Sequence, residues 1–302
     1  MAKEQFRTFR FRSDTISMIE QANTIIIAYQ AQGYRLTLRQ LYYQFVSRDL
    51  LANNERNYKK LGDVISDGRL AGLIDWDAIE DRTRNLRGVS HWDSPSNIIQ
   101  AAYQSFRLDK WTNQPNRVEV WIEKDALVGV IERVCQRNDV SYFACRGYVS
   151  QSEMYVAGQR IAGYIEDGQD VTVLHLGDHD PSGLDMTRDI RDRLDLFLEG
   201  MGIDIDRLAL NWQQVELYGP PPNPAKVTDS RFDNYQREYG DESWELDALE
   251  PQVISDLIEE NILALRDDDL WEEKIEEERH HHELLRRTSD EWERVAQFLA
   301  AS

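Results

Sequence analysis

Apolar side chains recur with two different periods along the chain. Up to about residue 95 they fall three or four positions apart, which is the spacing of amphipathic helices. This spacing predicts helices over 14–30, 38–46 and 58–71, with Thr37 as the N-cap of the second. Three short helices, the last with a basic side and followed by a possible wing, favour a helix-turn-helix or winged-helix module. A small helical bundle of no special function fits the same pattern.

From Val118 onward, short apolar runs alternate with helical segments, which is typical of a parallel α/β sheet. We expect strands over 118–122, 140–145, 171–176 and 208–217, helices over 125–137, 150–167 and 184–200, and a charged aromatic loop over 231–244. The sequence therefore predicts an α/β protein in three parts. These are a mostly helical winged-helix domain over 1–95, a connector with one helix over 96–116, and a parallel-sheet domain with an acidic helical C-terminal extension over 117–302.

The net charge of −20 is unevenly distributed. Residues 1–117 hold 17 Lys and Arg against 13 Asp and Glu, whereas residues 241–302 hold 6 against 20. The overall charge therefore does not exclude DNA binding by the arginine-rich N-terminal third. The candidate DNA contacts there are Lys59, Lys60, Arg69, Arg82, Arg84 and Arg87. We expect the acidic C-terminal part to face away from DNA, to form a dimer contact, or to limit DNA access.

The composition also indicates the cellular compartment. No apolar run is long enough for a transmembrane helix, and no apolar segment follows the basic N-terminal residues as it would in a secretory signal. The two cysteines, Cys135 and Cys145, show no metal-binding spacing. We therefore expect a cytoplasmic protein with no membrane partner.

Acidic residues follow two of the predicted strands. Glu123 follows the strand over 118–122, while Asp178 and Asp180 follow the strand over 171–176. Carboxyl ends of parallel strands lie at one edge of a sheet, so these carboxylates are expected to meet there. Oxygen ligands suit Mg²⁺, and the three acids predict a site for one or two such ions. Taken singly, Glu123 also suits a helix N-cap, and the aspartate pair suits an Asx turn.

Three further charged residues have expected roles near these acids. Lys124 is placed to balance the charge of a phosphate. Glu245 and Asp247 precede a predicted helix, where capping is the expected role and an outer layer of carboxylates around the metal is the alternative.

The order of the motifs resembles a known family. Glu123-Lys124, Arg146-Gly147-Tyr148 and the run Gly177-Asp178-His179-Asp180-Pro181-Ser182-Gly183 resemble the TOPRIM domain of topoisomerase VI A subunits and related meiotic double-strand-break transesterases. Arg39-Gln40-Leu41-Tyr42-Tyr43 resembles the Arg-x-x-Tyr-Tyr motif of their winged-helix domain. The resemblance covers about residues 35–190, and the short chain is similar to the stand-alone bacterial Mini-A homologues.

The resemblance implies a type IIB topoisomerase-like enzyme that cleaves double-stranded DNA by transesterification. Tyr43 would be the nucleophile that forms a 5′-phosphotyrosyl link, and Glu123, Asp178 and Asp180 would hold Mg²⁺. The family also implies a homodimer in which Tyr43 of one protomer faces the metal site of the other. Arg39 lies four residues before Tyr43, hence on the same helical face, where its charge would stabilise a phenolate or the phosphorane.

Several functions stay open at this level. No Gly-x-x-x-x-Gly-Lys motif or other nucleotide site is recognised, so a separate ATPase subunit is a possible partner and resealing of the cut is undecided. A hydrolytic TOPRIM nuclease with a structural Tyr43 is one alternative. A non-catalytic DNA-binding regulator is the other, since a Tyr-Tyr pair in an amphipathic helix usually belongs to the core.

Overall fold

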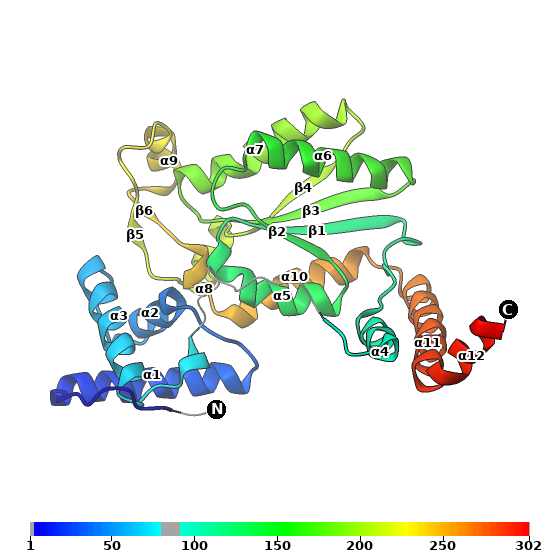
Figure 1. The fold of residues 1–302 in the computed structure, drawn as a ribbon. Helices are drawn as coiled ribbons and strands as arrows, with labels where there is room; N and C mark the ends of the chain where they lie inside the picture. Colours follow the sequence, from blue (N-terminus) through cyan, green and yellow to red (C-terminus); the bar gives the residue numbers. More distant parts are fainter. Residues whose placement is uncertain (1–2, 80–90, 302) are drawn as a thin grey trace.

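A four-stranded parallel sheet forms the centre of the protein (Figure 1). The computed structural model describes residues 3–79 and 91–301. The strands are β1 (Asn116–Ile122), β2 (Ser141–Ala144), β3 (Asp170–Leu176) and β4 (Asp204–Ala209), in the order β2-β1-β3-β4. All neighbouring strands are parallel, and Ile122 at the end of β1 pairs with Leu176 at the end of β3. The predicted α/β class with a parallel sheet is therefore confirmed.

Helices cover both faces of this sheet (Figure 1). On one face lie α6 (Gln151–Glu166) and α7 (Pro181–Leu198), and on the other lie α5 (Val128–Arg137) and α10 (Pro251–Leu265). Alternation along each strand divides the apolar side chains between two cores: Trp121 and Val173 pack toward α6 and α7, whereas Val120 and Leu174 pack toward α5 and α10. Because both faces are covered, the central strands are continuous apolar runs.

The N-terminal helices pack around a third hydrophobic core. They are α1 (Ser13–Ala31), α2 (Leu38–Ser47) and α3 (Glu55–Leu70), followed by the 3₁₀ turn η1 (Trp76–Ala78). Thr37 caps α2 in a reciprocal capping box with Gln40, as expected from the sequence. The helix α3 begins three residues earlier than predicted because Asn54 supplies its N-cap. The residues of the expected wing, with Arg82, Arg84 and Arg87, lie outside the described part of the chain.

Two sequence expectations on the far edge of the sheet are wrong. The strand expected over 208–217 is instead the end of β4 followed by the helix α8 (Trp212–Tyr218). Alternating apolar residues suggested a strand, but the Asn211 N–H donates to Gln214 Oε1 and starts a helix. The expected loop over 231–244 contains the helix α9 (Phe232–Tyr239) and the strand β6 (Glu242–Ser243), which pairs with β5 (Asn223–Pro224).

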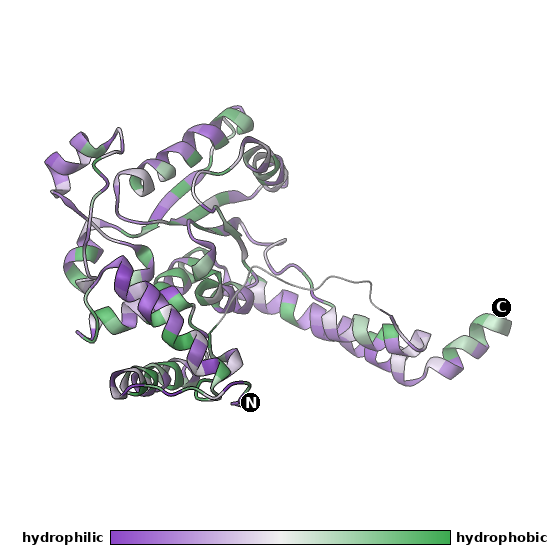
Figure 2. Cartoon of the chain, turned by 60° about the vertical axis from the view of Figure 1, so that its left-hand side comes forward, coloured by the Kyte–Doolittle hydropathy of each residue, from purple (hydrophilic) through white to green (hydrophobic). Residues whose placement is uncertain are grey.

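The remaining elements form an arm and two short turns. The helix α4 (Pro95–Ser105) lies along α11 (Asp268–Asp290), and α12 (Trp292–Ala301) continues that arm away from the N-terminal helices (Figure 2). The connector helix is therefore packed against the acidic extension, and Lys110, further along the connector, pairs with Glu278 of α11. The turns are η2 (Asp125–Leu127) and η3 (Leu246–Ala248). Within the described helices, none is both long and apolar enough to cross a membrane.

Candidate functional site

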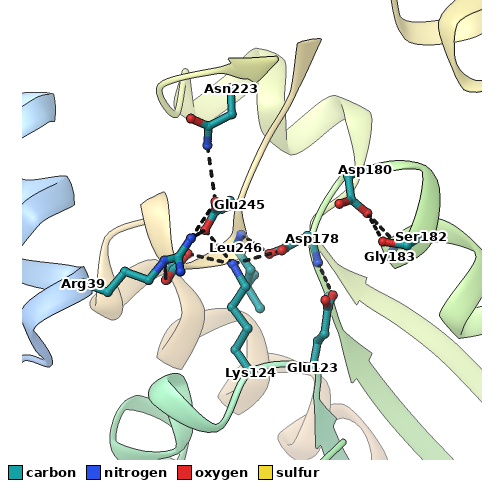
Figure 3. Close-up of polar contacts among 12 residues, drawn as sticks. Arg39, Glu123, Lys124, Asp178, Asp180, Ser182, Gly183, Asn223, Glu245 and Leu246 are labelled. Carbon is teal, nitrogen blue, oxygen red and sulfur yellow. Dashed lines mark hydrogen bonds and ion pairs between the residues drawn. The ribbon is translucent and has the colours of Figure 1, made fainter. Parts of the chain in front are cut away.

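Glu123 and Asp178 meet at the carboxyl edge of the sheet, as their positions after β1 and β3 predict (Figure 3). The Glu123 Oε2 accepts a hydrogen bond from the Asp178 N–H at 2.9 Å. Glu123 does not cap the following turn, so the simpler role considered for it is wrong. Burial raises the pKa of Asp178 to about 6, and the charge of Glu123 adds to that rise. The two carboxyl groups therefore share a desolvated, electronegative position.

Asp180 has a different orientation (Figure 3). It is the N-cap of α7, where its Oδ1 accepts from the Gly183 N–H at 2.6 Å and from the Ser182 hydroxyl at 2.9 Å. Glycine is required at position 183 because a Cβ there would collide with the Asp178 carbonyl. In the described part of the chain, no group of three or more His, Cys, Asp or Glu side chains is arranged to hold a metal ion.

Lys124 lies at the centre of three carboxylates. Its Nζ is 2.9 Å from Asp178 Oδ2, 2.8 Å from Glu245 Oε2 and 3.0 Å from Asp247 Oδ1. Burial alone would lower the pKa of Lys124, but the charges of Asp247, Asp178 and Glu245 raise it above the usual value. In this structure the ammonium is thus bound by carboxylates instead of standing free for a phosphate.

Glu245 and Asp247 belong to the site, which the sequence indicated only as the less favoured alternative. Neither caps a helix end through its side chain, so the expected role is wrong. The backbones of His179 and Trp244 exchange two hydrogen bonds, at 2.8 and 3.0 Å, and bring residues 244–247 beside the strand ends. The Leu246 N–H then donates to Asp178 Oδ1 at 2.8 Å. In the sequence, this segment is distinguished only by two acids one residue apart, Glu245 and Asp247, which is the spacing of Asp178 and Asp180. Such a pair alone is a weak signal for a site.

The aromatic residues around His179 hold this bridge in place. The His179 ring lies within 6 Å of four aromatic rings, and its Nδ1 is 3.0 Å from the Tyr235 hydroxyl. Burial lowers the pKa of His179 to about 4, so the ring is neutral at pH 7. His179 therefore acts as a structural support for the neighbouring aspartates.

The helix α2 meets this cluster through Arg39. The Arg39 Nη2 donates to both oxygens of Glu245, at 2.8 and 2.6 Å, and its Nε is 3.3 Å from Asp247 Oδ2. Tyr43 lies one turn further along α2 and is 4% exposed. It is not among the residues of the N-terminal core, whereas Tyr42 is.

Tyr43 lines a cavity of about 460 Å³ between the N-terminal helices and the sheet domain. Arg39, Asn223 and Glu245 line the same cavity. Burial and the charges of Asp247 and Glu245 raise the pKa of Tyr43 well above its usual value, while Asn223 and Arg39 oppose that rise. The phenol therefore keeps its proton at neutral pH in this arrangement.

The predicted DNA contacts lie on different surfaces. Lys59 and Lys60 line a groove of about 870 Å³, and Lys59 reaches the Tyr43 cavity as well. The groove has a mixed charge, because it is also lined by Arg10, Arg12, Arg56, Asp14, Glu55, Asp63 and Asp67. Arg69 is placed differently: its guanidinium donates to the carbonyls of Trp76 and Ile79, which stabilises the turn after α3. Arg82, Arg84 and Arg87 lie outside the described residues.

Comparison of the sequence with protein-family models and with curated proteins gives no match.

Proposed function

We propose that this chain is a Mg²⁺-dependent DNA transesterase, with a winged-helix part that carries Tyr43 and a TOPRIM part that carries Glu123, Asp178 and Asp180. The observation that supports this most is the contact between Arg39 and Glu245, which places the Tyr43 helix directly against the acidic edge of the sheet. Tyr43, Arg39 and Glu245 line one cavity, and Lys124 links the Glu245 carboxylate to Asp178 and Asp247. A tyrosine with cations and carboxylates close by is what phosphoryl transfer to a side-chain oxygen requires.

The proposed reaction is an exchange of ester bonds at a DNA phosphate. The Tyr43 oxygen attacks phosphorus, a new phosphotyrosyl bond forms to the 5′ end, and the 3′ oxygen leaves with a proton. Burial raises the pKa of Tyr43, but Arg39, on the Tyr43 face of α2, opposes that rise, so it would stabilise the phenolate as the proton departs. Lys124 acts on the phosphate charge, as the sequence indicates.

The charge balance of the site fits a divalent cation. Five carboxylates gather here with three cationic side chains, namely Glu123, Asp178, Asp180, Glu245 and Asp247 with Arg39, Lys124 and Arg207. The Asp247 Oδ2 is buried and accepts no hydrogen bond, although it forms an ion pair with Arg39 Nε at 3.3 Å, and all the candidate ligand atoms are the hard oxygens that Mg²⁺ prefers. Glu123, Asp178 and Asp180 would hold the ion, and bound Mg²⁺ supplies neutralisation of phosphate charge. Asp180 must turn from its capping position to take part.

The proposed partners are double-stranded DNA and a second copy of the chain. A separate ATPase subunit is a further proposed partner. The family arrangement places Tyr43 of one protomer at the metal site of the other. Within the single chain, Tyr43 lines a cavity together with Glu245 of its own chain. Assembly in a dimer would therefore require α2 to exchange that contact for one with the partner.

A hydrolytic nuclease is the second candidate function. The burial of Tyr43 and its retained proton favour it, because a phenol in this state is a poor nucleophile. In that case Tyr43 is structural, and water attacks the phosphate.

One cleavage experiment separates these functions. Supercoiled plasmid is incubated with protein and Mg²⁺, quenched in detergent, and compared with and without protease. DNA ends that stay bound to protein, and that disappear in Tyr43→Phe, support the transesterase. Free ends that persist in Tyr43→Phe support the nuclease, and absence of cleavage with every divalent ion contradicts both and favours a DNA-binding regulator.

A further inference from the structure

The carboxylate of Glu245 is held in the way that proteins hold a phosphate group. It accepts two hydrogen bonds from Arg39, one from Lys124 at 2.8 Å and one from Asn223 Nδ2 at 3.5 Å (Figure 3). The fork of an arginine matches two oxygens of a carboxylate or of a phosphate equally well. These donors come from three separate segments, α2, the end of β1 and β5, so the fold itself builds the anion site.

Among the acids of the cluster, Glu245 is the one whose side chain can move away from its cationic partners. Its side chain is 22% exposed, whereas that of Asp247 is fully buried. Asp178 and Asp247 also contact Lys124, so that lysine keeps two carboxylate partners when Glu245 moves. Glu245 lines the Tyr43 cavity, and the space next to its carboxylate is therefore next to the proposed nucleophile.

We propose that Arg39, Lys124 and Asn223 form a binding subsite for a DNA phosphodiester, and that Glu245 occupies this subsite as an internal anion until DNA displaces it. The inference rests on the proposed function, because it assigns the cavity beside Tyr43 to the phosphate that is cut. Lys124 and Arg39 offset the effect of burial and lower the pKa of Glu245 to about 2, so the competing group is an anion at every working pH. Glu245 thus prevents other anions from binding to Arg39 and Lys124. It limits cleavage to DNA that binds tightly enough to replace its carboxylate.

Binding of inorganic phosphate tests the subsite without any need for cleavage. Phosphate affinity is measured by calorimetry in chelator for the wild type, Glu245→Gln and the control Glu242→Gln. The control makes the same change of charge on an exposed residue three positions earlier in the same segment. Glu245→Gln should bind phosphate at least tenfold more tightly than the wild type, Glu242→Gln should match the wild type, and Lys124→Met added to Glu245→Gln should remove the gain. Equal affinity of Glu245→Gln and wild type, or an equal gain in Glu242→Gln, overturns the inference.

A labelling experiment on the wild-type protein covers the case in which Glu245→Gln does not fold. Carboxyl groups are modified with carbodiimide and an amine, with and without a saturating DNA duplex that lacks terminal phosphates. Displacement by DNA should raise the labelling of Glu245 at least threefold while Glu242 stays constant, and unchanged labelling of Glu245 contradicts the inference. These results are independent of the cleavage assay: Tyr43-dependent cutting with no displacement removes the inference alone, and displacement without cutting removes the proposed function alone.

Discussion

Arg39 and Glu245 are 206 residues apart in sequence and are joined by two hydrogen bonds of 2.8 and 2.6 Å. Arg39 is anchored in α2, whose side chains form the N-terminal core, while Glu245 is fixed by the backbone bridge between His179 and Trp244. The pair therefore connects the helix of Tyr43 to the strand ends that carry Glu123 and Asp178. Through this contact, Tyr43 and Glu245 line one cavity although they belong to parts of the chain with separate hydrophobic cores.

Lys124 should be the most important single charge for the stability of the site. Lys124→Met leaves Asp178, Glu245 and Asp247 without their common partner in a desolvated position. Removing one partner of a buried ion pair costs about 3–5 kcal/mol. We therefore expect Lys124→Met to lower the free energy of unfolding by about that amount at pH 7. Chemical denaturation measures it. Lys274→Met, which removes a pair on the exposed face of α11, should stay close to the wild type, and a similarly small effect for Lys124→Met would show that the cluster is well hydrated.

Substitutions at Asp180 should separate its capping role from its proposed metal role. Asparagine caps helices as well as aspartate, so Asp180→Asn should keep the stability of the wild type. Asp180→Ala should lose about 1 kcal/mol because the Gly183 N–H is left without its acceptor.

Both variants should reduce Mg²⁺-dependent cleavage by at least about tenfold. Asp192→Asn, the same change on an exposed position of α7, serves as the control for cleavage. Full cleavage activity in Asp180→Asn would exclude Asp180 from the metal site.

The buried His179 should make the protein less stable in mild acid. Its folded pKa of about 4 lies below the ordinary value of 6.5, so the unfolded chain takes up the proton first as the pH falls. The contribution of this group is complete above pH 6.5 and is lost as the pH falls from 6.5 to 4, with a slope of up to about 1.4 kcal/mol per pH unit. His175, whose pKa burial lowers to about 3, acts in the same direction.

Denaturation curves between pH 7 and pH 4.5 in chelator test this prediction. His179→Phe keeps an aromatic ring in the cage and should flatten the pH dependence, whereas the exposed His91→Gln should leave it unchanged. The same slope in wild type and His179→Phe would show that His179 titrates freely in the folded protein.

The part of the site that follows from local pattern could be predicted, and the part that depends on distant pairing could not. Apolar runs end at Ile122 and Leu176, and two parallel strands in register then place Glu123 beside Asp178. Asp180, by contrast, has the role that an aspartate before a helix usually has, because it is the N-cap of α7.

For Glu245, the sequence favours helix capping, and its place in the site is only the alternative. Its place depends on the His179–Trp244 bridge and on the aromatic rings of α8 and α9 around His179. The sequence predicts a strand where α8 lies and a loop where α9 lies. No local periodicity encodes such a bridge, because it is a contact between two loops. The packing of Arg39 on Glu245 depends in turn on that bridge, so the cavity around Tyr43 could not be predicted from the sequence.

Chemical identification of the residue that becomes linked to DNA tests the central claim most directly. Protein, Mg²⁺ and a DNA duplex are quenched in detergent, the DNA and protein are digested, and the nucleotide-bearing peptide is sequenced by mass spectrometry. Tyr58→Phe, a change on another tyrosine that lines the same cavity, is the matched control for Tyr43→Phe. We predict a 5′-nucleotide on Tyr43 in the wild type and in Tyr58→Phe, and none in Tyr43→Phe. Cleaved DNA with no nucleotide on Tyr43, or with one on another residue, would contradict the account.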